Sequence, residues 1–473
     1  MGAPAAVNKA IQWGMRQLQK RVPYNARNPF LEGVYAPLKD EYTETDLVVE
    51  GEIPAGLNGV LARIGPNPLQ VENPAIYNWF LGDGMVHGLK LQNGRALWYR
   101  NRYVGVDSVN ATLGRPTAPG PRRGVGDVVN TNIIGHAGQL WALVEAGSLP
   151  VALDGEFNTV RHGLFNSSTQ RAFSAHPHQD PDTGDLHAVC YDAPVRDKVR
   201  YLCIGKDGEL KRDVAIPVQH GPMIHDCAIT QSKVIILDLP VTFSVARVLK
   251  GSGLPYAWNA RHQARVGVLP RNGGSADVRW YPIDPCFVFH TCNAYDLDNG
   301  DIMLDVVVHA RVFEHSTQGP LENQPITFER WTLENATGRV RRQVISREPQ
   351  EFPRLDERLT SKPYRYAYAI TVNPDAGQPV ANSLLRHDLQ SGETLRHDYG
   401  EGWSSGEVVF VPRSAAAKED EGWLLSYVHD VQGGHSKVVI LDAQKLGQPP
   451  QAEIKLPVRV PLGFHGNWIA DQK

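Results

Sequence analysis

The sequence predicts a mainly β protein, and a β-propeller is the preferred architecture among three β folds. Short strand-like runs flank turns that contain glycine, as in LKLQNGRALWY, DPDTGDLHAVCY and NAYDLDNGDIMLDVVV. Long amphipathic helices are scarce after the N-terminus, and strands do not alternate with helices. Such a series of hairpins is typical of a propeller, a sandwich or a large barrel. A propeller is favoured because its axis lets side chains from distant parts of the sequence converge.

The first thirty residues differ from the rest and predict a helix. We expect residues 1–30 to form an N-terminal amphipathic helix and arm, and residues 31–473 to form a single propeller domain. Within residues 5–22, apolar side chains recur at helical spacing beside basic ones, and no acidic residue occurs before Glu32. The apolar positions are Val7, Ile11, Met15, Leu18 and Val22. This pattern is typical either of a helix packed on the main body or of one at a membrane surface.

Two long stretches between predicted strands are candidate lids or ordinary solvated loops. One is the proline- and glycine-rich stretch at residues 112–127, and the other is the charged stretch at residues 345–366. The sequence does not choose between the two roles, because loop length alone says little about function.

Composition excludes several classes of protein. The net charge of −3 gives no general electrostatic reason to expect a polyanion partner, so we expect no nucleic acid partner. The five cysteines are odd in number and form no CxxC pair, which disfavours a disulfide framework or a thiolate zinc site. No signal peptide and no apolar run of membrane-spanning length is found. We therefore expect a cytoplasmic protein, peripheral to a membrane if the N-terminal helix meets one.

Four of the seventeen histidines lie in similar contexts, each beside apolar or small residues at the edge of a predicted strand. They are His176 in SAHPHQDP, His225 in MIHDCAI, His290 in FVFHTCNAYD and His465 in GFHGNW. Neutral imidazoles suit iron, zinc, copper and nickel, and separate propeller blades can bring them to one axis. Their spacing in the sequence does not by itself select these four.

Longer motifs carry a specific resemblance. EGEIPAGLNGVLARIGPNPL, YNWFLGDGMVHGLKL and RVPLGFHGNW occur in this order, and over nearly its whole length the chain resembles the carotenoid cleavage oxygenases. The resemblance implies a seven-bladed β-propeller with a loop and helix cap over an Fe(2+) ion on its axis. It also implies a non-haem iron(II) dioxygenase that cleaves a C=C double bond with O₂ to give two carbonyl products.

The resemblance also implies a set of site residues. It places the four iron ligands on His176, His225, His290 and His465, and three outer glutamates on Glu145, Glu351 and Glu407. Carboxylates that accept the outer ring N–H fix each imidazole tautomer and offset the charge of the ion. Four histidines in an octahedron leave two open positions, whereas a structural zinc site closes its tetrahedron. His87 and His178 match no ligand position and are expected to be structural.

The substrate is predicted by two weaker features. Tyr103 matches the region of a phenol-binding tyrosine in relatives that cleave phenols, but His136 and Ala137 stand where stilbene cleavers carry a lysine. We therefore expect a carotenoid or apocarotenoid with Tyr103 and His136 near it. A phenolic aryl alkene such as lignostilbene, resveratrol, isoeugenol or 4-vinylguaiacol is the alternative. A zinc protein and a metal-free propeller that serves as a binding scaffold are the alternatives from other classes.

Overall fold

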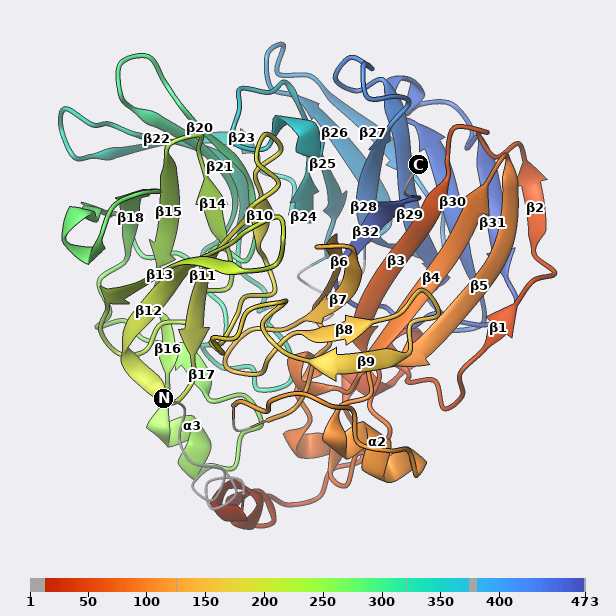
Figure 1. Ribbon diagram of the computed structural model, residues 1–473, viewed down its shortest axis with the longest axis horizontal. Helices are drawn as coiled ribbons and strands as arrows, with labels where there is room; N and C mark the ends of the chain where they lie inside the picture. Colours follow the sequence, from red (N-terminus) through yellow and green to blue (C-terminus); the bar gives the residue numbers. More distant parts are fainter. Residues whose placement is uncertain (1–12, 125, 321, 374–380, 472–473) are drawn as a thin grey trace.

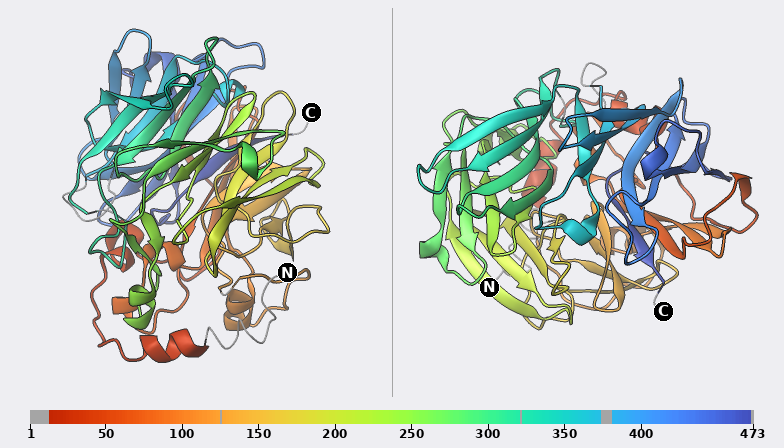
Figure 2. Two further views of the ribbon diagram at one scale, coloured as in Figure 1. Left: turned by 90° about the vertical axis from the view of Figure 1, so that its left-hand side faces the viewer. Right: turned by 90° about the horizontal axis from the view of Figure 1, so that it is seen from above.

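The computed structural model describes residues 13–124, 126–320, 322–373 and 381–471. In this part of the chain, seven sheets of four or five strands are arranged around one axis (Figures 1 and 2). Each sheet is one blade, so the prediction of a seven-bladed propeller is confirmed. A small hairpin of β16 (Val241–Phe243) and β17 (Tyr256–Trp258) extends from the fourth blade toward the cap.

Blades two to six each use four antiparallel strands in chain order, the first of which lies nearest the axis. The second blade has β6 (Asn132–His136), β7 (Gln139–Leu143), β8 (Val151–Leu153) and β9 (Thr159–His162). The third has β10 (His178–Gln179), β11 (Leu186–Asp192), β12 (Val195–Ile204) and β13 (Leu210–Pro217). The fourth has β14 (Cys227–Ile229), β15 (Lys233–Asp238), β18 (Arg265–Pro270) and β19 (Arg279–Pro282). The fifth has β20 (Thr291–Asp296), β21 (Ile302–His309), β22 (Ile326–Leu333) and β23 (Val340–Ser346), and the sixth has β24 (Gln350–Arg354), β25 (Tyr366–Thr371), β26 (Ser383–Asp388) and β27 (Thr394–Asp398).

The first and seventh blades close the ring by exchanging strands from the two ends of the described chain. The first blade runs β32 (Gly466–Ala470), β3 (Gly59–Pro66), β4 (Gly84–Gln92), β5 (Arg95–Tyr103) and β1 (Thr43–Glu44). The seventh runs β28 (Trp403–Pro412), β29 (Gly422–Asp430), β30 (Ser436–Asp442), β31 (Ala452–Leu456) and β2 (Val48–Gly51). The late strand β32 is therefore the inner strand of the first blade, and the early strand β2 is the outer strand of the last.

Glycines at the predicted turns explain many of the hairpins. Gly94 joins β4 to β5 with φ 73°, and Gly338 lies before β23 with φ 70°, a left-handed backbone that residues with a β-carbon rarely adopt. The lid prediction for residues 345–366 is wrong in its central part. Residues Gln350–Arg354 form β24, the inner strand of the sixth blade, and a register shift between Glu351 and Arg354 hides its alternation in the sequence.

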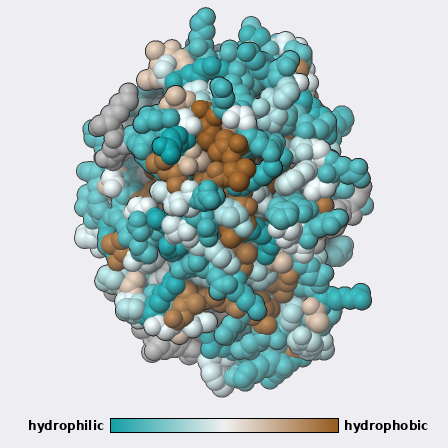
Figure 3. All heavy atoms as spheres, turned by 90° about the vertical axis from the view of Figure 1, so that its right-hand side faces the viewer, coloured by the Kyte–Doolittle hydropathy of each residue, from teal (hydrophilic) through white to brown (hydrophobic). Residues whose placement is uncertain are grey.

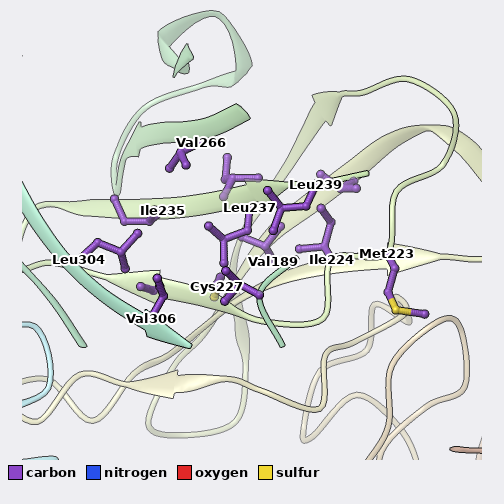
Figure 4. Close-up of a cluster of buried hydrophobic side chains, with 14 of the residues drawn as sticks. Val189, Met223, Ile224, Cys227, Ile235, Leu237, Leu239, Val266, Leu304 and Val306 are labelled. Carbon is purple, nitrogen blue, oxygen red and sulfur yellow. The ribbon is translucent and has the colours of Figure 1, made fainter. Parts of the chain in front are cut away.

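The core lies between neighbouring blades. Figure 4 shows one cluster of buried side chains that includes Val189 of the third blade, Leu237 and Val266 of the fourth and Leu304 of the fifth, and all four are at most 2% exposed. Burial of these facing sheets stabilises the ring at about 25 cal/mol per Å² of apolar surface. On the side where the first and seventh blades meet, hydrophobic residues lie in patches among hydrophilic ones (Figure 3).

Helical segments gather at one end of the propeller and form the predicted cap (Figures 1 and 2). They are residues 13–19, α2 (Asp107–Leu113), α3 (Val245–Leu249), and 3₁₀ turns that include η1 (Pro29–Leu31), η2 (Gly33–Tyr35), η3 (Pro74–Ile76) and η4 (Trp79–Leu81). Other 3₁₀ turns, η5 (Ser275–Asp277), η6 (Glu357–Leu359) and η8 (Ala443–Lys445), occur in the blades. Residues 5–12 of the predicted N-terminal helix lie outside the described residues. Among the helices that are described, none is long and apolar enough to cross a bilayer.

Candidate metal centre

All four predicted histidines lie directly before strands that run along the axis. His176 and His225 each precede the inner strand of their blade by two residues, and His290 and His465 by one. The strands concerned are β10, β14, β20 and β32. Because inner strands of a propeller start at the same end of the axis, this position brings side chains from four blades together.

The four rings form one buried cluster. Nitrogen atoms of His176, His225 and His290 lie within 4.8 Å of one another, as donors of a single metal ion would. The ring centroid of His465 lies 4.5 Å from that of His176 and 4.8 Å from that of His290. The His465 nitrogen is not part of the 4.8 Å group, but its ring completes the cluster around the axis. Each of the four residues is at most 9% exposed.

The three glutamates each contact a different ring of this cluster. Nδ1 of His225 lies 3.0 Å from Glu145 Oε1, Nδ1 of His290 lies 2.6 Å from Glu351 Oε2, and Nδ1 of His465 lies 3.1 Å from Glu407 Oε1. A carboxylate that accepts from Nδ1–H fixes the tautomer with the lone pair on Nε2, the nitrogen left for a metal. Among the described residues, no carboxylate contacts His176.

Each blade supplies one member of this set. The histidines come from the first, third, fourth and fifth blades, and the glutamates from the second, sixth and seventh. Glu351 lies in β24 and Glu407 in β28, both inner strands, whereas Glu145 follows β7 by two residues. The seven blades thus supply four histidines and three carboxylates around one point.

The buried nitrogens fit a metal ion. Nε2 of His176 and Nε2 of His290 are fully buried and have no hydrogen-bond partner within the described part of the chain. A buried polar atom left without a partner costs about 1–3 kcal/mol, which coordination would offset. Burial, with the neighbouring histidines, lowers the pKa of His176 and keeps its ring neutral, as a ligand must be.

Two of the outer carboxylates, Glu351 and Glu407, stay ionised. Burial acts to raise the pKa of Glu351 and Glu407, but His290 and His309 beside the first and Arg354 and His465 beside the second outweigh it and hold each pKa well below the ordinary value. His309 Nε2 lies 2.5 Å from Glu351 Oε1, and the amide of Gly466 donates to Glu407 Oε2 at 2.9 Å. Sequence reasoning missed His309, which lies in β21 away from the four motifs.

His87 and His178 both have structural partners. Nε2 of His178 lies 2.9 Å from Asp226 Oδ1, while Thr291 donates its amide and hydroxyl to the other oxygen of Asp226. These hydrogen bonds join the third, fourth and fifth blades beside the histidine cluster. Nδ1 of His87 lies 2.9 Å from the hydroxyl of Tyr99 within the first blade.

Two cavities meet at the cluster. The apolar cavity, of about 600 Å³, lies on the cap side and is lined by Phe80, Phe289, Phe352, Phe464, Tyr191 and Tyr256 together with His225, His290 and His465. The polar cavity, of about 1030 Å³, includes Asn132, His136, Gln179, Asp226, Arg354 and Arg358 in its wall and reaches His176, His290 and His465. The histidine cluster can therefore be reached from one apolar cavity and from one polar cavity.

Aromatic side chains of the apolar cavity were not identified from the sequence. The ring centroid of Phe289 lies 5.2 Å from that of His225, and the centroid of Phe352 lies 5.0 Å from that of His290. Phe289 and Phe464 each directly precede a histidine of the cluster, which is the one signal that could have found them. Phe352 has φ 53°, a strained backbone that directs its ring toward the cluster beside Glu351.

The structure places Tyr103 and His136 away from the apolar cavity. The hydroxyl of Tyr103 donates to Leu38 O at 2.8 Å and accepts from Nδ2 of Asn67 at 2.5 Å, so its hydrogen bonds are already made. His136 lines the polar cavity, where its Nε2 donates to Gly205 O at 2.8 Å. This geometry argues against the substrate-binding role predicted for both residues.

Comparisons with known proteins agree with this architecture. The family model described as retinal pigment epithelial membrane protein matches residues 35–470. A carotenoid cleavage oxygenase of Mycobacterium tuberculosis is 40% identical, with 94% of this chain and 98% of the relative covered. Carotenoid 9,10(9',10')-cleavage dioxygenase 1 of Arabidopsis thaliana is 30% identical over 97% of this chain and 93% of its own length.

Solved structures show the same fold. The lignostilbene dioxygenase of Pseudomonas brassicacearum superposes with a TM-score of 0.84 at 29% identity, covering 95% of this chain and all of that chain (100%). A Synechocystis apocarotenoid oxygenase variant gives a TM-score of 0.82 at 26% identity over 93% of this chain and 98% of its own. With seven blades, a buried histidine cluster and these relatives, the chain belongs to the carotenoid cleavage oxygenase family and is an oxidoreductase that incorporates O₂.

Proposed function

We propose that this protein is a non-haem iron(II) dioxygenase that cleaves a C=C double bond of a carotenoid or apocarotenoid with O₂, giving two carbonyl products. The observation that carries the proposal is the position of the histidine cluster at the inner end of an aromatic, apolar cavity. His176, His225, His290 and His465 would hold the ion through Nε2, and Glu145, Glu351 and Glu407 would orient three of the rings.

The donor set favours iron(II) over a structural zinc ion. Four neutral imidazoles contribute no charge, and in an octahedron they leave two positions open, whereas a structural zinc site is closed. When bound, the ferrous ion would supply the oxygen-activating chemistry. The protein's own part is to hold the alkene beside the cluster, exclude water with Phe289, Phe352 and Phe464, and keep each ring in the required tautomer.

The cavity favours a long apolar substrate. Within the described residues, Arg16 at the rim is the only arginine that lines it, and no lysine does, so apart from the histidines its lining has one basic side chain. A polyene without charged groups would be held by burial of apolar surface, and the depth of the cavity would select the bond that reaches the cluster. The names of the carotenoid-cleaving relatives support this class of substrate.

A phenolic aryl alkene is the second candidate, and two observations favour it. The lignostilbene dioxygenase superposes with a TM-score of 0.84, and Tyr191 and Tyr256, whose side chains carry hydroxyl groups, line the apolar cavity. These groups are able to hydrogen-bond a phenol. The absence of a lysine from the described lining argues against a phenolate clamp.

We also infer that the protein is cytoplasmic and contacts the surface of a membrane through residues 5–22. Met15, Arg16 and Gln19 line the rim of the apolar cavity beside Val248 of α3. Three apolar side chains of this end are exposed, namely Trp13 at 67%, Leu249 at 66% and Val245 at 52%. A polyene dissolved in a bilayer would enter the cavity here without crossing water.

The test combines metal analysis with a substrate panel. The protein is reconstituted with ferrous ion, its iron and zinc are measured, and β-carotene, several apocarotenals, lignostilbene, resveratrol, isoeugenol and 4-vinylguaiacol are assayed. We expect one iron per chain, cleavage of a polyene, and ¹⁸O from ¹⁸O₂ in both products. Zinc at full occupancy with no turnover after ferrous reconstitution would overturn the oxygenase assignment. Cleavage of the phenolic alkenes, with no cleavage of a polyene, would replace the carotenoid substrate by a phenolic aryl alkene.

A further inference from the structure

The three outer glutamates of the histidine cluster differ in their other partners. Glu351 Oε1 lies 2.5 Å from Nε2 of His309. Glu145 Oε2 is buried and has no hydrogen-bond partner within the described residues. Among the three, only Glu407 is paired in the described chain with a permanent cation, the guanidinium of Arg354. This positive charge distinguishes the carboxylate that holds the fourth histidine ring from the other two.

Arg354 is largely buried where three blades meet. It belongs to β24 of the sixth blade, and its side chain is 13% exposed. Its Nη1 lies 3.1 Å from Glu407 Oε1, in β28 of the seventh blade, and donates to Gly466 O, in β32 of the first blade, at 3.1 Å. Its Nη2 donates to Asn467 Oδ1 at 2.9 Å. One guanidinium thus bridges the carboxylate of Glu407 and the strand that directly follows His465.

The backbone of His465 is held in place without Arg354. Its amide donates to Thr131 O at 3.2 Å, and its carbonyl accepts from the amide of Ile64 at 3.0 Å. The imidazole ring, by contrast, makes one side-chain hydrogen bond within the described residues, from Nδ1 to Glu407 Oε1 at 3.1 Å. The orientation of the ring therefore depends on where the carboxylate of Glu407 is held.

A guanidinium suits this position better than another cation. Its planar fork carries five N–H donors in a fixed geometry, so one side chain can hold several acceptors at once. Arg354 also pairs with Glu357, but that carboxylate is 60% exposed and water screens the pair. The side chain of Glu407 is only 4% exposed, so its pair with Arg354 is screened much less. Glu407 is therefore the carboxylate that Arg354 holds most firmly.

We propose that Arg354 is a positioning residue for the fourth donor of the metal centre. By fixing Glu407 against β32, it holds the ring of His465 beside the other three histidines. This role rests on the proposed function, since it requires that His465 binds the ion. The nitrogen of His465 is not part of the 4.8 Å group that the other three histidines form, so this donor depends most on an outer clamp.

Cobalt binding tests the proposal, with the number of imidazole ligands as its readout. Metal-free protein receives Co(II) below its own concentration, and X-ray absorption of the bound ion counts the imidazoles around it. We expect four in the wild-type protein and three in Arg354→Gln, because the ring of His465 would lose its orientation. The affinity for Co(II), measured by competition with a chelator, should fall by about ten- to a hundredfold, as for other residues that orient a metal ligand.

Arg358→Gln is the matched control, because Arg358 lines the same polar cavity but pairs with Asp356. It should keep four imidazoles and the wild-type affinity. Arg354→Lys keeps the charge without the fork and should also show three imidazoles, so it decides the question if Arg354→Gln does not fold. Four imidazoles in either Arg354 variant, or equal losses in Arg358→Gln, would overturn the proposal. Wild-type protein that binds no cobalt would overturn the metal centre of the proposed function, and this role of Arg354 with it.

Discussion

The apolar and polar cavities approach the same histidine cluster from opposite ends of the axis, yet they offer different chemistry. Both reach His290 and His465, but only the apolar cavity reaches His225 and only the polar cavity reaches His176. The apolar wall is built from aromatic side chains on the cap side, whereas the polar wall contains Arg354, Arg358 and Asp226. The difference indicates that the cluster divides a space for an apolar substrate from a space for water and ions.

The largest effect is expected when a histidine of the cluster itself is replaced. Replacing His176, on the polar side, or His225, on the apolar side, by Ala should each remove bound metal and nearly all turnover, because each ring would supply one donor. Iron content and product formation are measured on folded protein. His136→Ala, which changes the polar cavity without touching the cluster, should keep its iron. Full iron in His176→Ala would remove this residue from the ligand set.

The outer carboxylates should have the next largest effect. Glu351→Gln should reduce iron affinity or turnover by about ten- to a hundredfold, because the amide still fills the space but no longer carries charge for His290 and His309. Glu357→Gln, an exposed carboxylate on the polar side, should change neither. Metal affinity is measured by competition with a chelator. Equal effects of the two substitutions would show that the contact with His290 is not what matters.

An arginine introduced into each cavity in turn should then show which of the two cavities binds the substrate. Ala193→Arg places a cation in the apolar cavity and should lower kcat/KM for a polyene by about tenfold or more, equal to about 1.4 kcal/mol. Ala470→Arg places the same side chain in the polar cavity, where kcat/KM should change by less than about twofold. Equal losses in the two variants would refute the assignment of the substrate to the apolar side.

The smallest effect is expected at the cap. Leu249→Ser should weaken binding to phospholipid vesicles by about threefold, because one exposed apolar side chain near the cavity rim is lost. Val160→Ser, on the outer strand of the second blade, removes an apolar side chain that is 39% exposed and should have no effect. Vesicle co-sedimentation measures both, and equal binding of all three proteins would contradict a membrane contact at the cap.

The sequence predicted the hairpins and the motifs of the ring better than the cavity. A turn such as the one at Gly94 can be predicted because its left-handed backbone favours glycine. The histidines can be predicted because they lie in long recognisable motifs. The strand β24 was mistaken for a loop because Pro349, Pro353 and the irregular pairing after Glu351 break its alternation. Tyr103 was assigned to the substrate from its motif alone, which does not reveal that Asn67 and Leu38 already occupy its hydroxyl.

The contacts that shape the site are the least predictable. Phe80, Phe289, Phe352 and Phe464 come from four separate segments, and only the folded ring brings them to one cavity. The pairing of each glutamate with its histidine likewise depends on which blades are neighbours. Sequence separations of 58 to 80 residues between these partners carry no local signal.

The exchange of β32 into the first blade has a consequence for biosynthesis. Translation delivers His176, His225 and His290 well before His465, and His465 arrives directly ahead of the strand that closes the ring. A nascent chain on the ribosome thus holds three donors in an open, incomplete ring, and the fourth joins them only when closure occurs. If these four histidines hold the metal as proposed, its acquisition would be coupled to completion of the fold, and chaperones and proteases would meet ring-open chains mainly in the metal-free state.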